Sequence, residues 1–297
     1  MQDRLVTASA TNGTVSLVAG VTTRVVREAQ RRHRLAPTAS AAVGRLITGA
    51  GLLGASLGSR ERLTLQIKGD GPIGSIVADS WNAGEGCVAA RAYARYPGAD
   101  IPLNARGKFD VAGVIGKGQL QVTKSYEVGQ PYNGIVPLET GEIGDDIAAY
   151  LANSQQIPSV VALGVLANPE GIVAAGGIIA QLMPGADDAT VATLEHNARA
   201  MPPVTQQIVA GADGEALLAA VTGSLGLNVF RDFAIEFDCR CTREKVESAL
   251  LGLGRDELSK IASEQPHTEA TCEFCKRQYV LSASEVTALV SRLDARG

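Results

Sequence analysis

Hydrophobic and polar residues alternate in several short segments of the first 180 residues, which is the pattern of half-buried β-strands. The clearest example is a hairpin, in which residues 63–67 alternate, Gly-Asp-Gly-Pro at 69–72 forms the turn, and residues 73–78 return. Few helical crossovers separate the strands, so antiparallel or mixed sheets are favoured over a doubly wound parallel sheet. The further predicted strands are 14–22, 87–93, 118–126, 160–167 and 172–179.

Three helices are predicted among these strands. Residues 23–34 form a basic amphipathic helix, Pro37 opens a second helix that continues to about residue 57, and a third covers 145–154. The second helix contains the most hydrophobic stretch of the chain, residues 41–57, which includes Arg45. This stretch is shorter than the roughly 20 apolar residues that a bilayer span requires. We therefore expect a buried helix and no membrane partner.

From residue 187 to 227 the pattern changes to short helices, which are interrupted at 201–203, at Gly211 and at Gly214. Their apolar positions are few and are padded with Ala, so these helices cannot be stable alone and must dock on another part of the protein. A strand at 230–238 then leads into a tail that carries four cysteines. The predicted α+β architecture has three parts: an α+β core domain at 1–182, a helical linker at 183–230 and a small C-terminal domain at 231–297.

The composition argues against several classes of protein. Hydrophobic residues make up 45% and charged residues 20%, which excludes global disorder. The net charge of −4 and the pI of about 5.5 argue against a nucleic-acid partner held by bulk electrostatics. The first residues include an early Asp and no apolar run, so we expect no signal peptide and a cytoplasmic location. Thiols stay reduced in that compartment, where static disulfides are rare.

Four of the five cysteines form two close pairs, Cys239-Arg240-Cys241 and Cys272-Glu273-Phe274-Cys275. Four thiolates at tetrahedral geometry suit Zn²⁺, and C-x-x-C is a common spacing in zinc sites. In a strand the residues at i and i+2 point to the same face, so both sulfurs of the C-x-C pair can reach one ion. We predict one zinc ion in the reduced protein, with four ligands: Cys239, Cys241, Cys272 and Cys275.

Two simpler interpretations of this cluster remain open. In the first, the zinc is purely structural and holds together a region too small to fold alone. In the second, His267 replaces one thiolate, because it lies five residues before Cys272 in a polar loop. Four thiolates already complete a tetrahedral site, which favours the all-cysteine set.

The spacing within each cysteine pair favours a redox function. Each pair is close enough to oxidise internally, and a C-x-C disulfide closes a tight ring that should be strained and easily reduced. Structural zinc contributes on the order of 10–16 kcal/mol in small peptides, whereas whole domains are stable by only about 5–15 kcal/mol. Two local disulfides cannot restore the tie that one ion makes across the intervening 30 residues. Oxidation is therefore expected to release the metal and unfold the tail.

Three other motifs carry weaker signals. The G-x-G-x-x-G at 49–54 lies inside a helical run, which favours close helix packing over dinucleotide binding. The basic run at 24–34 is typical of a solvated helix face. Cys87 begins an apolar strand and is expected to be a buried, inert thiol, to which we assign no role.

The sequence resembles a known family, the bacterial redox-regulated heat-shock chaperones of about thirty-three kilodaltons. The strongest match is Phe-Asp-Cys-Arg-Cys-Thr at 237–242 with Cys-Glu-Phe-Cys at 272–275. The resemblance extends over nearly the whole chain and includes all four family cysteines at matching spacing, whereas Cys87 matches no family motif. Other segments that look like family signatures are 42–46, 69–74, 136–143 and 181–186.

This resemblance implies an ATP-independent holdase of the oxidative stress response and not an enzyme. It implies that the reduced, zinc-bound form is inactive, and that oxidation forms the disulfides Cys239–Cys241 and Cys272–Cys275 and releases zinc. The C-terminal domain is then a redox switch that unfolds together with the linker. The apolar surface exposed in this way binds unfolding client proteins, and the active form is a homodimer.

Two alternatives come from other functional classes. One is a zinc-stapled protein with an unrecognised enzymatic site in residues 1–180, which only Gly-rich turns and scattered carboxylates support. The other is a constitutive interaction module with a structural zinc, whose metal site should resist peroxide.

Overall fold

The computed structural model describes residues 2–84 and 86–294. The chain divides into two compact units, a core unit that ends at Asp238 and a cysteine unit that begins at Cys239. The boundary predicted between residues 230 and 231 falls inside a strand of the core unit, β10 (Asn228–Phe237). The division into core, linker and switch concerns behaviour on oxidation, and it stays a prediction.

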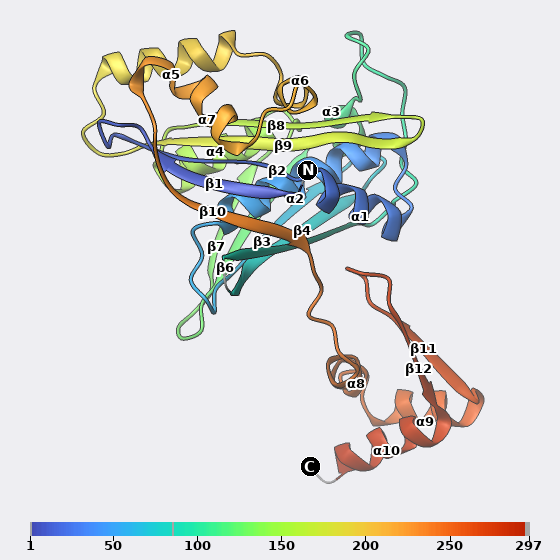
Figure 1. Cartoon of the computed structure of the whole chain (residues 1–297). Helices are drawn as coiled ribbons and strands as arrows, with labels where there is room; N and C mark the ends of the chain where they lie inside the picture. Colours follow the sequence, from blue (N-terminus) through green and yellow to red (C-terminus); the bar gives the residue numbers. More distant parts are fainter. Residues whose placement is uncertain (1, 85, 295–297) are drawn as a thin grey trace. The chain divides into compact units, whose positions relative to one another are not determined.

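The core unit is built on a ten-stranded sheet (Figure 1), which confirms the α+β class with a mixed sheet. Its order is β7-β6-β3-β4-β5-β10-β1-β2-β9-β8, and neighbours are antiparallel except for the parallel pair β10 and β5. The remaining strands are β1 (Arg4–Ser9), β2 (Val15–Val21), β3 (Arg62–Gly69), β4 (Ser75–Gly84), β5 (Cys87–Ala94), β6 (Gly118–Ser125), β7 (Tyr132–Pro137), β8 (Ser159–Asn168) and β9 (Gly171–Leu182).

Every strand predicted from alternation is present, and in the core unit the sequence pattern missed two others. β1 lies between β10 and β2 in the middle of the sheet and is covered on both faces, so Leu5 and Val6 are both buried and no alternation results. β7 is an edge strand that contains Gly134 and Pro137, residues that usually indicate turns. Position in the sheet therefore explains both omissions.

Four helices cover one face of the sheet and enclose the main hydrophobic core: α1 (Thr23–His33), α2 (Pro37–Gly54), α3 (Val111–Ile115) and α4 (Gly144–Ser154). As predicted, α2 is buried, with Leu46 and Ile47 fully inaccessible. Its Arg45 is paired with Glu142. No helix in the described part of the chain is long and apolar enough to cross a membrane.

The glycines of the G-x-G-x-x-G segment let α2 approach its neighbours closely. A Cβ at Gly51 would lie 2.5 Å from Cδ1 of Ile235, and a Cβ at Gly54 would lie 1.9 Å from Oγ of Ser80. Both distances are far below van der Waals contact, so any side chain there would push the helix off the sheet. The motif is thus a packing device inside a helix, as expected from its context.

The opposite face of the sheet is covered by the predicted linker, which forms α5 (Asp188–Ala200), α6 (Val204–Val209), α7 (Gly214–Thr222) and the 3₁₀ turn η1 (Gly223–Leu225). The helices are separated at 201–203 and near Gly211, where Pro and Gly predicted breaks. Docking of these short helices is confirmed, since their buried side chains share a second hydrophobic cluster with β1, β2 and β9.

We call the sheet surface under these helices the linker-covered face, formed by Val6, Ala8, Leu17, Ala19, Ile178 and Ala180. The contact is close. A Cβ at Gly214 would lie 2.9 Å from Cγ2 of Val6, and a Cβ at Gly176 would lie 2.5 Å from Cδ1 of Ile208. Undocking of α5–α7 would expose a contiguous apolar surface on the sheet.

The segment at 136–143 ends in a turn that Asp146 organises. The buried carboxylate of Asp146 accepts hydrogen bonds from the backbone N–H groups of Glu139, Thr140, Gly141 and Ile143, over 2.8–3.2 Å. These four bonds hold Ile143 at a φ of 66°, a left-handed conformation that a β-branched residue rarely adopts. Because one carboxylate satisfies four backbone donors, the conformation of this turn depends on Asp146.

The cysteine unit is small and contains α8 (Arg243–Leu251), α9 (Arg255–Glu264), β11 (His267–Thr271), β12 (Gln278–Ser282) and α10 (Ala283–Asp294). β11 and β12 form an antiparallel hairpin. Four apolar side chains make its buried core: Leu258, Leu281, Val286 and Leu289. A core of this size supplies little stability, and the unit needs a further cross-link to hold its fold.

Replacing Gly54 with Ala tests the packing role of the glycines in α2. We expect Gly54→Ala to lower the free energy of unfolding by about 1–3 kcal/mol, because the new methyl group meets both Oγ and Cβ of Ser80. Gly58→Ala is the control, since its Cβ would meet only the Glu61 side chain at 3.4 Å or more. Urea unfolding measures both, and equal effects would contradict the packing role.

Asp3 predicts a pH dependence of core stability. Its side chain is 2% exposed, and Oδ2 accepts a hydrogen bond from the backbone N–H of Val25. Burial raises the pKa of Asp3 to about 6, which outweighs that hydrogen bond. The folded state therefore favours the protonated acid, and stability is lost as the pH rises from about 4 through 6.

The variant Asp3→Asn removes this titration and keeps an acceptor for Val25. Its free energy of unfolding should match that of the unmodified protein near pH 4 and exceed it by up to about 3 kcal/mol at pH 7, at about 1.36 kcal/mol per pKa unit. Urea unfolding at a series of pH values gives this difference. A difference that does not change with pH would show that Asp3 titrates normally.

Candidate metal centre

Cys239 and Cys241 lie in an irregular segment between β10, which ends at Phe237, and α8, which begins at Arg243. The strand predicted at 230–238 is present as β10 and ends before the first cysteine, so the i and i+2 geometry of a strand is not what brings these two sulfurs together. Thr242 caps α8, and its Oγ1 accepts a hydrogen bond from the N–H of Lys245. This cap fixes the start of α8 directly after Cys241.

Cys272 and Cys275 occupy the tight turn that joins β11 to β12. Within it the N–H of Cys272 donates to the carbonyl of Arg277 over 3.0 Å, and the N–H of Lys276 donates to the carbonyl of Cys272 over 2.8 Å. Lys276 has a φ of 58°, the left-handed conformation that closes the turn. The turn holds the two thiols next to each other at one end of the hairpin.

The four sulfurs form one cluster, and all lie within 4.8 Å of one another. The Sγ atoms are 3.7 Å apart between Cys239 and Cys272 and 3.3 Å apart between Cys241 and Cys275. A tetrahedral ion with metal–sulfur bonds of about 2.3 Å places its sulfurs about 3.8 Å apart, close to these values. A disulfide requires about 2.05 Å, so the four cysteines are in the thiol state.

The donor set therefore fits a soft divalent ion that takes four thiolates. Each of the two short sulfur contacts joins one cysteine of the first pair to one of the second. One ion at the centre would cross-link the segment before α8 to the turn of the hairpin. His267 lies at the exposed start of β11 and is not among the residues that could share an ion with the cysteines.

The environments of the thiols differ. Burial raises the pKa of Cys241, but hydrogen bonds from Tyr279 and from the other three cysteines outweigh it and lower the pKa to about 7. Burial raises the pKa of Cys275 well above the ordinary thiol value. A bound divalent cation would deprotonate both, since coordinated thiols are thiolates.

Sequence reasoning missed one residue of the site, Tyr279. Its hydroxyl donates a hydrogen bond to Sγ of Cys241 over 3.1 Å. One signal was available, because Tyr279 lies four positions after Cys275 in a short run of residues with high strand propensity. Only the folded hairpin, however, brings position 279 next to a cysteine 38 residues earlier.

Cys87 lies apart from the cluster, at the first position of β5 in the core unit. Its side chain is partly exposed, so the expectation of a fully buried thiol is wrong. Burial raises the pKa of Cys87, and the carboxylates of Glu236 and Asp238 raise it further. A raised pKa keeps the thiol protonated and slow to react, which agrees with the expected inertness.

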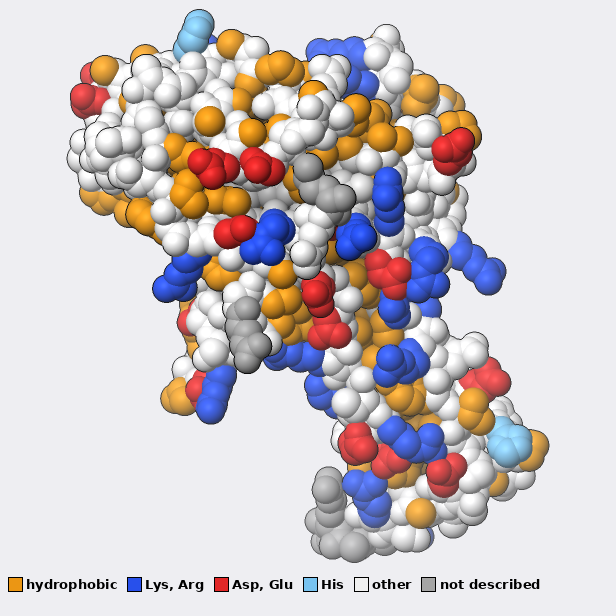
Figure 2. Space-filling model, in the orientation of Figure 1, with side chains coloured by type: hydrophobic (Ala, Val, Ile, Leu, Met, Phe, Trp, Pro, Cys, Tyr) orange, Lys and Arg blue, Asp and Glu red, His pale blue; other side chains and the backbone are white. Residues whose placement is uncertain are grey.

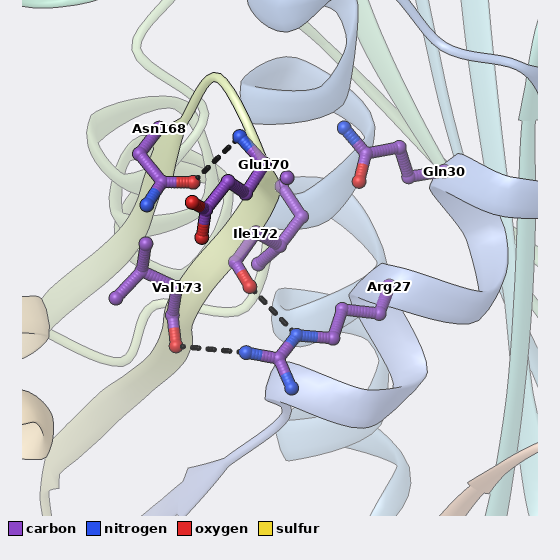
Figure 3. A pocket seen from close by; sticks show the side chains of 7 residues that line it. Arg27, Gln30, Asn168, Glu170, Ile172 and Val173 are labelled. Carbon is purple, nitrogen blue, oxygen red and sulfur yellow. Dashed lines mark hydrogen bonds between the residues drawn. The ribbon is translucent and has the colours of Figure 1, made fainter.

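Arg27, from the basic run on α1, lines a cavity of about 350 Å³ beside the β8–β9 hairpin (Figure 3). Its Nε donates to the carbonyl of Ile172 over 2.6 Å, and its Nη2 donates to that of Val173 over 3.4 Å. In the same pocket the N–H of Glu170 donates to Oδ1 of Asn168. The two bonds from Arg27 fasten the hairpin to α1, and we assign Arg27 a structural role.

Comparisons with known proteins agree over the whole chain. The family model described as "Hsp33 protein" matches residues 3–282. A relative named "33 kDa chaperonin" from Geobacillus kaustophilus is 43% identical over 97% of this chain and 98% of its own length. One with the same name from Clostridium acetobutylicum is 40% identical over 99% of both chains. The crystal structure of the 33 kDa chaperonin from Thermotoga maritima superposes with a TM-score of 0.90 at 34% identity, covering 99% of this chain and 100% of that one.

Removing one sulfur tests the ligand set. Cys241→Ser is expected to lower metal affinity by orders of magnitude and to loosen the cysteine unit without any oxidant, because three thiolates leave the tetrahedron open. Metal content after purification and competition with a chromophoric chelator measure the loss. Cys87→Ser, which removes a thiol outside the cluster, should leave metal content unchanged, and full affinity in Cys241→Ser would show that the ligand set is wrong.

Proposed function

This chain belongs to the Hsp33 family, and from that membership we propose that it is a chaperone that oxidation switches on and that holds unfolding proteins without ATP. The reduced, metal-bound form is inactive. Oxidation of the four clustered cysteines releases the metal, unfolds the cysteine unit and undocks the linker helices from the core. Two observations carry the proposal: the cluster of four sulfurs in the cysteine unit, and the chain segment in the core unit that covers an apolar sheet face.

The metal in this proposal is one Zn²⁺ ion, held by the thiolates of Cys239, Cys241, Cys272 and Cys275. When bound, it supplies a cross-link between two segments that are far apart in the sequence, with no redox chemistry of its own. Structural zinc is worth on the order of 10–16 kcal/mol in small peptides. The small apolar core of the cysteine unit cannot replace a contribution of that size.

Oxidation acts by using up the ligands. In each pair, one thiolate attacks a peroxide oxygen, the O–O bond breaks, and the second thiolate displaces hydroxide from the resulting sulfenic acid. The two thiolates of each pair thus give up two electrons to form one disulfide, and one peroxide with two protons becomes two water molecules. We propose the pairs Cys239–Cys241 and Cys272–Cys275. These bridges close loops of only a few residues, which leaves the two segments unconnected.

Unfolding then reaches the linker through β10, which connects η1 to Cys239. β10 pairs with β1 from Asn228 to Ala234 and with β5 only from Ala234 to Phe237, and its first five residues are exposed. The linker helices are short and held mainly by contacts with the linker-covered face. Loss of this docking exposes that face and the apolar sides of α5–α7 together.

The functional parts in this proposal are a core at 1–182, a linker at 183–230 and a redox switch at 231–297. The partners are client proteins that expose apolar segments as they unfold, and the active form is a homodimer in the cytoplasm. Figure 2 shows acidic and basic side chains interspersed over the visible surface. Together with the net charge of −4, this mixture supports a client-binding role rather than nucleic-acid binding.

Aggregation of a heated client protein tests the proposal. The zinc-loaded, reduced chain should not suppress light scattering by the client, whereas the same chain after peroxide and mild heat should suppress it at near-stoichiometric ratios. A metal-binding dye followed in parallel should show one zinc released per chain.

Two results would overturn this account. One is equal suppression by the reduced, metal-bound form, and the other is a zinc site that survives peroxide under these conditions. The chain with Cys239, Cys241, Cys272 and Cys275 all replaced by Ser is the control for nonspecific effects of oxidant. It should show no change in suppression on peroxide treatment.

A further inference from the structure

Tyr279 stands next to the sulfur cluster without belonging to it. β12 alternates so that Tyr279 shares the face of Leu281, which is fully buried, while Gln278 and Val280 are exposed on the other face. Pairing with Ala270 in β11 fixes the strand register. The phenol is therefore carried by the hairpin to the cluster, where its hydroxyl donates to Sγ of Cys241 over 3.1 Å.

We propose that Tyr279 is a positioning residue that sets how fast oxidant attacks Cys241, by donating a hydrogen bond to its thiolate. The inference rests on the proposed zinc site, and it adds a residue that controls the site's sensitivity to peroxide. The hydrogen bond withdraws electron density from the sulfur and so lowers the nucleophilicity of the thiolate toward peroxide. It also reduces the donor strength of that sulfur toward a metal ion.

The step that Tyr279 controls is the first one of oxidation. The Cys241 thiolate attacks peroxide, an S–O bond forms as the O–O bond breaks, and the departing hydroxide takes a proton to become water. The Cys239 thiolate then forms the S–S bond and displaces a second hydroxide. Tyr279 keeps its proton throughout these steps. Its hydrogen bond changes only how readily the sulfur of Cys241 donates an electron pair to peroxide.

The test compares Tyr279→Phe with the unmodified full chain, both loaded with zinc. Peroxide-driven zinc release should be about threefold faster in the variant, because nucleophilicity rises as the hydrogen bond to sulfur is removed. Release to a strong chelator without peroxide should be unchanged or slower, because Cys241 becomes a better metal ligand. The Co²⁺-loaded variant should show a shifted sulfur-to-metal charge-transfer band.

These readouts separate the proposal from a merely structural role. If Tyr279 only holds the hairpin together, the variant will lose zinc faster to the chelator as well as to peroxide, and the proposal fails. An unchanged peroxide rate also overturns it. In both cases zinc release from the unmodified chain still reports on the proposed switch, so the two failures are distinguishable.

The test includes a control variant and a second modification of position 279. Tyr126→Phe removes an exposed hydroxyl from the core unit and should leave both release rates unchanged. If Tyr279→Phe does not fold, 3-fluorotyrosine at position 279 keeps the shape of the side chain and is a stronger donor. It should slow peroxide-driven release, and faster release would contradict the proposal.

Discussion

The contact on which the rest of the structure depends is the approach of four sulfur atoms from two segments separated by 30 residues. The segment before α8 has no regular structure, and the hairpin of β11 and β12 has only two strands. A two-stranded hairpin is marginal by itself. In the proposed function, a cross-link at the sulfurs would join the hairpin to the helices, and the same sulfurs are the atoms that an oxidant would attack. Stability and sensitivity to oxidation therefore reside in one group of atoms.

The two faces of the sheet in the core unit are covered in different ways. One face of its sheet is closed by α1–α4 around a large apolar core that includes most of α2. The other face is closed by three short helices with a few buried side chains each. Such helices are stable only while docked, because their own apolar content is too small. The sheet can thus stay folded while its second face is uncovered.

Much of this arrangement followed from the sequence, and the omissions have physical causes. Alternation located β3 to β6, and Pro and Gly located the breaks between α5, α6 and α7. Spacing alone indicated the four cysteines as candidate metal ligands, since close pairs in a small region are characteristic of metal sites. β1 was missed because a strand that is covered on both faces does not alternate. Tyr279 escaped because its contact with Cys241 depends on how the hairpin folds back.

The central claim is that loss of the sulfur cross-link melts the cysteine unit and the linker while the rest of the core remains folded. Amide hydrogen exchange of the zinc-loaded and the peroxide-treated full chain, followed peptide by peptide, tests it most directly. We predict that after oxidation the segments 188–222 and 243–294 exchange as unfolded peptides, whereas 23–54 and 62–94 keep their protection. Retained protection of 243–294 once both disulfides have formed would contradict the account.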